Sequence, residues 1–151
     1  MTDCSGVKIV VAEDHALTRL AVKLMLQQYA EFDIVAEANN GNTAVAKTLE
    51  LHPAVVLMDI GMPILDGIEA TKKIKEVLPA TRVLMFTSHD DLDEFAAAMA
   101  AGADGYLLKE CSPSQLFMAI TTVLDQEASP LSPLSTSILR GDTPKQTKQQ
   151  V

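Results

Sequence analysis

The chain has 151 residues, 48% of them hydrophobic, which suits one compact domain with a substantial core. Its formal net charge is −8. Residues 128–151 carry three basic residues and one acidic residue, so residues 1–127 hold −10, and a domain this acidic is not expected to bind nucleic acid unaided. No apolar run approaches the roughly 20 residues that cross a bilayer, which excludes an integral membrane protein.

The N-terminus lacks the basic and then apolar pattern of a signal peptide. Cys4 and Cys111 have no metal-type spacing, and two isolated thiols suit a reducing compartment. We therefore expect a cytoplasmic protein, in which either cysteine acts as a small hydrophobic residue.

Five apolar segments alternate with helical patterns along the chain. The first segment, residues 7–12, ends at the acidic pair Glu13 and Asp14, and a helix follows it in which Leu17, Leu20, Ala21 and Leu24 recur at helical spacing. Residues 33–38 form a more polar strand, as expected at the edge of a sheet. Asn42 can cap the next helix, which runs to about Leu51.

Residues 55–58 form a continuous apolar run that indicates a strand buried on both faces. Gly61 and Pro63 cannot continue this strand, so Asp59 should stand at its carboxyl end.

The remaining elements repeat the same pattern. A helix from about Leu65 to Leu78 precedes a strand over 82–88. In the following helix Leu92, Phe95, Ala96 and Met99 form an apolar stripe, and Gly102 is the expected C-terminal stop. A strand over 105–109 comes next. Ser112 or Ser114 then begins the last helix, whose expected buried residues are Leu116, Ile120, Val123 and Leu124.

This alternation predicts an α/β fold in which a five-stranded parallel sheet is covered by helices on both faces. The edge-like second strand favours the strand order 2-1-3-4-5. From residue 128 the composition changes to Ser, Pro, Thr, Gln and Lys, which indicates a linker. Within this linker, residues 133–140 could alternatively form one short helix.

Polar side chains collect where these strands end. In a parallel sheet, Glu13, Asp14, Asp59, Thr87 and Lys109 would meet at one edge, although each alone has an ordinary structural explanation. Clustered carboxylates repel one another by about 1 kcal/mol per pair at contact, and a hard cation such as Mg²⁺ relieves that repulsion. These residue types allow phosphoryl transfer onto the carboxylate of Asp59, with positive charge supplied by Mg²⁺ and Lys109.

Four motifs in this order resemble a bacterial response-regulator receiver domain of the CheY-like fold, over about residues 7–127. They are Glu13-Asp14, the run from Val55 to Pro63 with Asp66-Gly67, Thr87-Ser88, and the run from Ala101 to Lys109. The Gly-Met-Pro after Asp59 and the run from Lys109 to Pro113 are most similar to the NarL/FixJ class.

The resemblance implies a role for each site residue. Asp59 would be the phosphoacceptor, and Glu13, Asp14 and the Gly61 carbonyl would hold Mg²⁺ together with Asp59. Lys109 would pair with the phosphoryl group. Thr87 and Tyr106 would form the switch, with the Tyr106 ring turning inward as the Thr87 hydroxyl follows the phosphoryl group.

The chain departs from the family pattern at two places. No proline follows Lys109, so the cis peptide bond that many receivers place there is not expected. Gly61 and His89 occupy positions whose side chains tune dephosphorylation in this family, which leaves the lifetime of the phosphate open.

The resemblance implies a sensor histidine kinase as partner and a phosphorylation switch, not an enzyme beyond its own phosphorylation and dephosphorylation. It also implies transcriptional output through a C-terminal helix-turn-helix DNA-binding domain that this chain does not contain. A stand-alone receiver acting on other proteins is the alternative. Homodimerisation on phosphorylation is a further hypothesis, for which the last helix, with Phe117 and Met118, offers a surface.

Two other classes fit less well. A flavodoxin-like cofactor binder shares the strand order, but it needs a phosphate-cradling loop after the first strand, where this chain places Glu13 and Asp14. A haloacid-dehalogenase-type phosphatase needs a second aspartate two residues after its nucleophile, where this chain has Gly61.

Overall fold

The computed structural model describes residues 6–88 and 90–125. Cys4, His89 and the expected linker over 128–151, with its alternative helix over 133–140, lie outside the described residues. The proposed domain boundary at residue 127 therefore stays a prediction.

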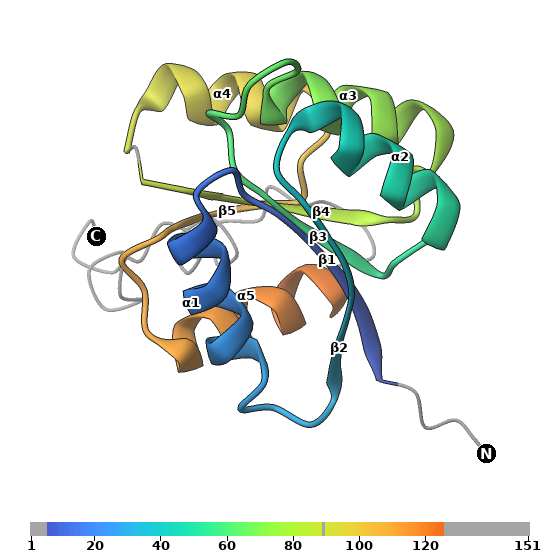
Figure 1. The fold of residues 1–151 in the computed structure, drawn as a ribbon. Helices are drawn as coiled ribbons and strands as arrows, with labels where there is room; N and C mark the ends of the chain where they lie inside the picture. The colour runs from blue at the N-terminus through green and yellow to red at the C-terminus, as the bar shows by residue number, and fades with distance from the viewer. Residues whose placement is uncertain (1–5, 89, 126–151) are drawn as a thin grey trace.

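Five strands alternate with five helices in the described chain (Figure 1). Every strand pair is parallel, and the order β2-β1-β3-β4-β5 confirms the predicted fold. The elements are β1 (Val7–Ala12), α1 (Ala16–Leu26), β2 (Phe32–Ala38), α2 (Gly41–Leu51), β3 (Val55–Met58), α3 (Gly67–Val77), β4 (Arg82–Thr87), α4 (Leu92–Ala100), β5 (Gly105–Leu108) and α5 (Pro113–Asp125).

The sheet separates two helical layers. Helices α1 and α5 cover one face, and α2, α3 and α4 cover the other (Figure 1). Successive residues of a strand point to opposite faces, so Ile9 and Val11 belong to the core beneath α1 and α5, whereas Val10 and Ala12 belong to the core beneath the other three helices. No helix in the described ranges is long and apolar enough to cross a membrane.

Local hydrogen bonds explain where the helices begin and end. Helix α2 is capped by Asn40, whose side chain accepts a hydrogen bond from the Thr43 amide at 2.8 Å, so the expectation that Asn42 caps this helix is wrong. Ser112 precedes α5 and accepts from the Gln115 amide, which favours Ser112 over Ser114 as its start. Gly102 has a φ of 108° just past α4, as expected of a C-terminal stop.

The apolar stripes on which the helices α1 and α4 were predicted are not fully buried in the structure. In α1 the buried residues are Val22 and Leu26, and the predicted stripe faces solvent, with Leu17 81% exposed. In α4 the fully buried residue is Ala98, while Leu92 is exposed at the start of the helix. Helical periodicity therefore identified these helices but not the side that meets the sheet. In α5, by contrast, Leu116, Ile120 and Val123 are buried as predicted, with Leu124 partly buried.

Candidate functional site

The carboxyl ends of β1, β3, β4 and β5 meet at one edge of the sheet. The Asp59 amide donates to the Ala12 carbonyl at 3.0 Å, and the Lys109 amide donates to the Thr87 carbonyl at 2.8 Å. These bonds extend the strand ladders by one residue and hold the site residues at adjacent strand ends.

Lys109 joins the acidic residues of this edge. Its Nζ lies 2.6 Å from Glu13 Oε1 and 3.3 Å from Asp59 Oδ2. Both carboxylates are buried, Glu13 to 2% and Asp59 to 6% exposure, so little water screens their charges. The lysine is the cation that makes burial of two anions tolerable here.

The two carboxyl groups respond oppositely to this environment. Burial works against ionisation of Glu13, but hydrogen bonds from Lys109 and the His15 amide outweigh it and lower its pKa below the usual value. Burial raises the pKa of Asp59 above its usual value, because the attraction of Lys109 does not offset desolvation and the repulsion of Glu13.

Asp14 and His15 complete the acidic loop after β1. Possible ligand atoms of Glu13, Asp14 and His15 lie within 4.8 Å of one another. His15 Nδ1 is 3.3 Å from Glu13 Oε2 and 3.5 Å from Asp14 Oδ1, and that buried Asp14 oxygen has no hydrogen-bond partner. A buried carboxylate oxygen without a partner beside further carboxylates fits the oxygen-rich environment that a hard cation prefers.

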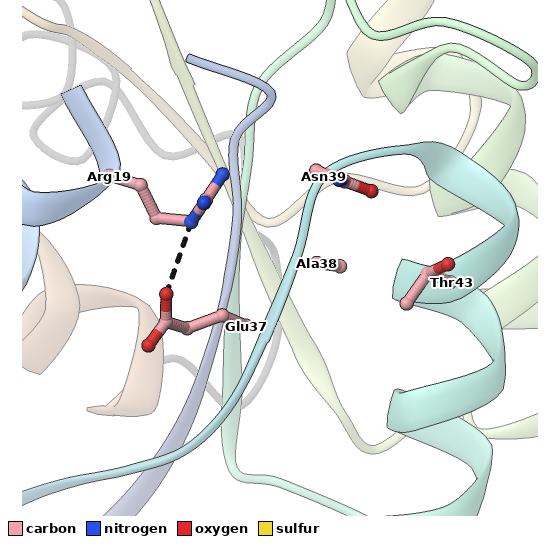
Figure 2. Close-up of a pocket in the computed structure, with 5 residues that line it drawn as sticks. All are labelled: Arg19, Glu37, Ala38, Asn39 and Thr43. Carbon is pink, nitrogen blue, oxygen red and sulfur yellow. Dashed lines mark hydrogen bonds and ion pairs between the residues drawn. The ribbon is translucent and has the colours of Figure 1, made fainter. Parts of the chain in front are cut away.

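Arg19 fixes the position of this loop. Its Nη1 donates to the Glu13 carbonyl at 2.7 Å, and its Nε donates to Glu37 Oε1 at 3.1 Å. Lys23 binds the other Glu37 oxygen at 2.7 Å, and Lys23 and Arg19 together lower the pKa of Glu37. Figure 2 shows Arg19 reaching from α1 to Glu37. Both residues line a hollow of about 190 Å³, together with Ala38, Asn39 and Thr43.

Two glycines shape the loop after β3. A Cβ on Gly67 would lie 2.0 Å from the Asp59 carbonyl oxygen, so only glycine allows α3 to begin this close to the site. A Cβ on Gly61 would have no atom within 4 Å, so this position is open.

The described peptide bonds include no cis bond, and the one after Lys109 is accordingly trans.

The two expected switch residues are both buried. Thr87 is 1% exposed at the end of β4, and Tyr106 is 1% exposed in β5. The Tyr106 ring packs edge-on against Phe95 of α4, with ring centroids 5.1 Å apart. The Tyr106 ring is therefore buried between β5 and α4 in this structure.

Sequence reasoning named Glu13, Asp14, Asp59, Thr87 and Lys109, and the fold brings all five to one edge. It did not identify His15 or Arg19. His15 directly follows the acidic pair, which was an available signal, whereas Arg19 and Glu37 are 18 residues apart and no local pattern joins them.

The half-buried Cys111 is no candidate, since burial raises the pKa of its thiol and disfavours the reactive thiolate.

A five-stranded parallel sheet in this order, with acidic residues, a threonine and a lysine at its carboxyl edge, defines the receiver class of signalling domains. Residues 9–121 match the family model of the response regulator receiver domain. The chain belongs to this family, and its relatives are response regulators of the NarL, DegU and VraR type.

Among curated proteins, the chain is 42% identical over 117 residues to the transcriptional regulatory protein LnrK of Bacillus subtilis, covering 78% of this chain and 53% of LnrK. It is 34% identical over 122 residues to the response regulator protein VraR of Staphylococcus saprophyticus, covering 81% and 58%. The chain thus spans about half the length of the curated relatives it matches.

Solved structures agree with this assignment. A LuxR-family two-component response regulator from Aurantimonas sp. superposes with a TM-score of 0.78 at 32% identity, covering 87% of this chain and 93% of that one. A LuxR-family DNA-binding response regulator from Staphylococcus aureus gives a TM-score of 0.75 at 29% identity, covering 79% and 99%.

Proposed function

We propose that Asp59 accepts a phosphoryl group from a sensor histidine kinase in a Mg²⁺-dependent reaction, and that the phosphorylated domain changes conformation to control an output. The observation that carries this proposal is the pairing of Lys109 with both Asp59 and Glu13 at the carboxyl edge of the sheet. A buried carboxylate beside a lysine and a second acidic group has the components of phosphoryl transfer onto an aspartate.

In the proposed reaction, an Asp59 carboxylate oxygen forms a bond to phosphorus while the bond from phosphorus to the histidine nitrogen of the kinase breaks. The electron pair of that bond leaves with the nitrogen. Lys109 Nζ already lies 3.3 Å from Asp59 Oδ2 and would balance the charge of the phosphoryl oxygens. The product is an acyl phosphate on Asp59.

Glu13, Asp14, Asp59 and the Gly61 carbonyl would hold Mg²⁺. The residues fit this ion, because they offer oxygen ligands only and because Asp14 Oδ1 is buried without a hydrogen-bond partner. A bound Mg²⁺ would neutralise charge on the transferring phosphoryl group. Arg19, through its bond to the Glu13 carbonyl, would keep the acidic loop in place for the ion.

The conformational change would involve Thr87 and Tyr106. The Thr87 hydroxyl would move toward the phosphoryl oxygens, and the Tyr106 ring would hold the inward position against Phe95. We propose that phosphorylation stabilises this inward position relative to an outward one, which would remake the surface of α4 and β5.

We further propose that the domain acts in the cytoplasm, forms homodimers on phosphorylation, and regulates transcription through a DNA-binding domain of the whole protein. Its curated relatives are transcriptional regulators about twice as long as the matched region. The acidic domain itself has no charge pattern suited to DNA. Apart from its own phosphorylation and dephosphorylation, we assign it no catalysis.

Labelling with acetyl phosphate tests the acceptor. The wild-type chain and the Asp59→Ala variant would be incubated with labelled acetyl phosphate and Mg²⁺, with the exposed Asp33→Ala variant on β2 as control. We expect wild type and the Asp33 variant to be labelled, the Asp59 variant not to be labelled, and EDTA to abolish labelling. Equal labelling of the Asp59 variant would show that the acceptor lies elsewhere.

A further inference from the structure

A third buried carboxyl group lies at the edge of the sheet opposite to the site. Besides Glu13 and Asp59, Asp104 is the buried acidic residue in the part of the chain that the structure describes, at 4% exposure just before β5. Its Oδ2 lies 2.8 Å from Lys75 Nζ, and its Oδ1 lies 3.4 Å from Arg82 Nη1. Two cations therefore compensate the charge of Asp104, although the proposed phosphoryl transfer does not involve it.

Lys75 connects three segments of the chain through this ion pair. Besides binding Asp104, its Nζ donates to the Thr81 carbonyl at 2.6 Å and to the Pro79 carbonyl at 3.2 Å. These three acceptors match the three N–H groups of an ammonium. A Cβ on Gly102 would lie 2.9 Å from Lys75 Cγ, so a glycine at this position leaves room for the lysine. The last turn of α3, the turn before β4 and the turn before β5 thus meet at one side chain.

The same carboxyl group fixes the start of β5 against β4. Asp104 Oδ2 accepts a hydrogen bond from the Val83 amide at 2.8 Å, and the Asp104 amide donates to the Val83 carbonyl at 2.8 Å. Tyr106 lies two residues further along, so its side chain points to the same face of the sheet, where it packs edge-on against Phe95 of α4. The place of this aromatic pair therefore depends on where β5 begins.

The two ends of α4, which lies beside α3 over the sheet (Figure 1), are held unequally. At its carboxyl end the fully buried Ala98 accepts a hydrogen bond at 3.0 Å from the amide of Ala103, the residue before Asp104. At its amino end, which follows Thr87 closely in the chain, Leu92 is 65% exposed. A helix of nine residues, about 14 Å long, that is anchored at one end can turn about that end.

We propose that Lys75 and Asp104 are positioning residues for the switch. The pair anchors the carboxyl end of α4 and the start of β5, so that α4 turns about this end when Asp59 is phosphorylated. The same anchor holds the Tyr106 ring in one place against Phe95 before phosphorylation. This inference rests on the proposed function, because the phosphorylation switch is part of it. Since the anchor and the site lie at opposite edges of the sheet, the pair acts on the switch without touching the phosphoryl group.

The ¹⁹F NMR signal of Tyr106 tests this role in the full chain. The parent chain carries Tyr29→Phe, so that 3-fluorotyrosine labels Tyr106 alone. The pair variant adds Lys75→Met and Asp104→Asn, which remove both charges and keep an acceptor for the Val83 amide, and the control adds Lys73→Met at an exposed position of α3. We expect one sharp signal from parent and control, and a split signal or one about twofold broader from the pair variant, because the start of β5 is released. Asp104→Asn alone, which leaves the carbonyl bonds of Lys75 intact, should broaden the signal less, and it decides the question if the pair variant does not fold.

Acetyl phosphate and Mg²⁺, added to the same samples, test the anchored end of α4. We expect all variants to be labelled equally, and the Tyr106 signal of the pair variant to shift by less than about half as much as that of the parent. In the parent, hydrogen exchange should change at residues 92–95 and stay unchanged at residues 98–104. The proposal is overturned if the variants show the sharp signal and the full shift of the parent, or if exchange in the parent changes alike at both ends of α4. A parent that is not labelled refutes the phosphoacceptor, and the width of the Tyr106 signal before phosphorylation then still decides the positioning role.

Discussion

Lys109 Nζ lies 0.7 Å closer to Glu13 than to Asp59, at 2.6 Å from Glu13 Oε1 and 3.3 Å from Asp59 Oδ2. The lysine is therefore shared unequally between two buried carboxylates. Glu13 is held as an anion, and its pKa falls, whereas Asp59 is buried with weaker compensation, and its pKa rises. The residue proposed to react is the one whose charge the fold stabilises less.

Because Lys109 compensates the charge of Asp59 less than that of Glu13, we predict that Asp59→Asn stabilises the protein in the absence of divalent cations. The substitution removes a buried charge that repels Glu13 and leaves Lys109 paired with Glu13 alone. We expect the free energy of unfolding at pH 7 to increase by about 1 kcal/mol. Urea denaturation of both proteins in EDTA measures this, and a less stable variant would contradict the assigned charge balance.

The same substitution has a predictable pH dependence. Asp59 has a higher pKa in the folded chain than in the unfolded chain, so its ionised form costs stability above the folded pKa. That cost disappears as the pH falls below the unfolded pKa, near 4. The stability difference between Asp59→Asn and wild type should therefore shrink from pH 7 toward pH 4, and a difference that grows on acidification would refute this reasoning.

Removal of Lys109 should have the opposite effect on stability. Lys109→Met leaves Glu13 and Asp59 buried without their cation, and we expect a loss of about 2 kcal/mol in the free energy of unfolding at pH 7. Lys72→Met, at an exposed position on α3, is the control and should change stability by about 0.5 kcal/mol or less. Similar losses in the two variants would mean that the lysine does not compensate the carboxylates.

Arg19 is predicted to affect cation binding through the Glu13 carbonyl. Arg19→Met removes the bonds to both Glu13 and Glu37, whereas Lys23→Met removes only a cation from Glu37. We expect the Arg19 variant to bind Mg²⁺ about tenfold more weakly and the Lys23 variant to bind it as wild type does. Calorimetric titration with Mg²⁺ measures both affinities, and equal affinities would leave Arg19 with a purely structural role.

The two glycines after β3 offer a matched pair of substitutions. A Cβ at position 67 meets the Asp59 carbonyl at 2.0 Å, so Gly67→Ala should displace Asp59 or α3 and cost about 2 kcal/mol or more. Gly61→Ala adds the same atom in open space and should leave stability nearly unchanged. Thermal unfolding of the two variants tests this contrast, and equal midpoints would show that the close approach of α3 is not required.

The sequence was sufficient to predict the strands because their apolar runs are continuous and their ends are sharp. The run from Val55 to Met58 breaks at Asp59, and the parallel sheet then places Glu13, Thr87 and Lys109 beside it. Once the strand order is known, neighbours at the sheet edge follow from chain geometry alone.

Other features depended on tertiary contacts that no local pattern encodes. The predicted apolar stripe of α1 has the spacing of a buried face, yet the sheet packs against Val22 and Leu26, because a helix with two apolar faces can bury either one. Asn40 caps α2 in place of Asn42, since both asparagines suit a cap and the backbone decides between them. The contact of Arg19 with Glu37 joins α1 to β2 across 18 residues of sequence, so it depends on how these two elements pack.

Locating the phosphoryl group after reaction with a small phosphodonor tests the central claim most directly. The full chain would be treated with acetyl phosphate and Mg²⁺, trapped by borohydride reduction of the acyl phosphate, digested, and its peptides analysed by mass spectrometry. The proposed mechanism predicts a single modified residue, Asp59, and none when Mg²⁺ is withheld. Modification at another carboxylate, or none in a folded chain that binds Mg²⁺, would contradict it.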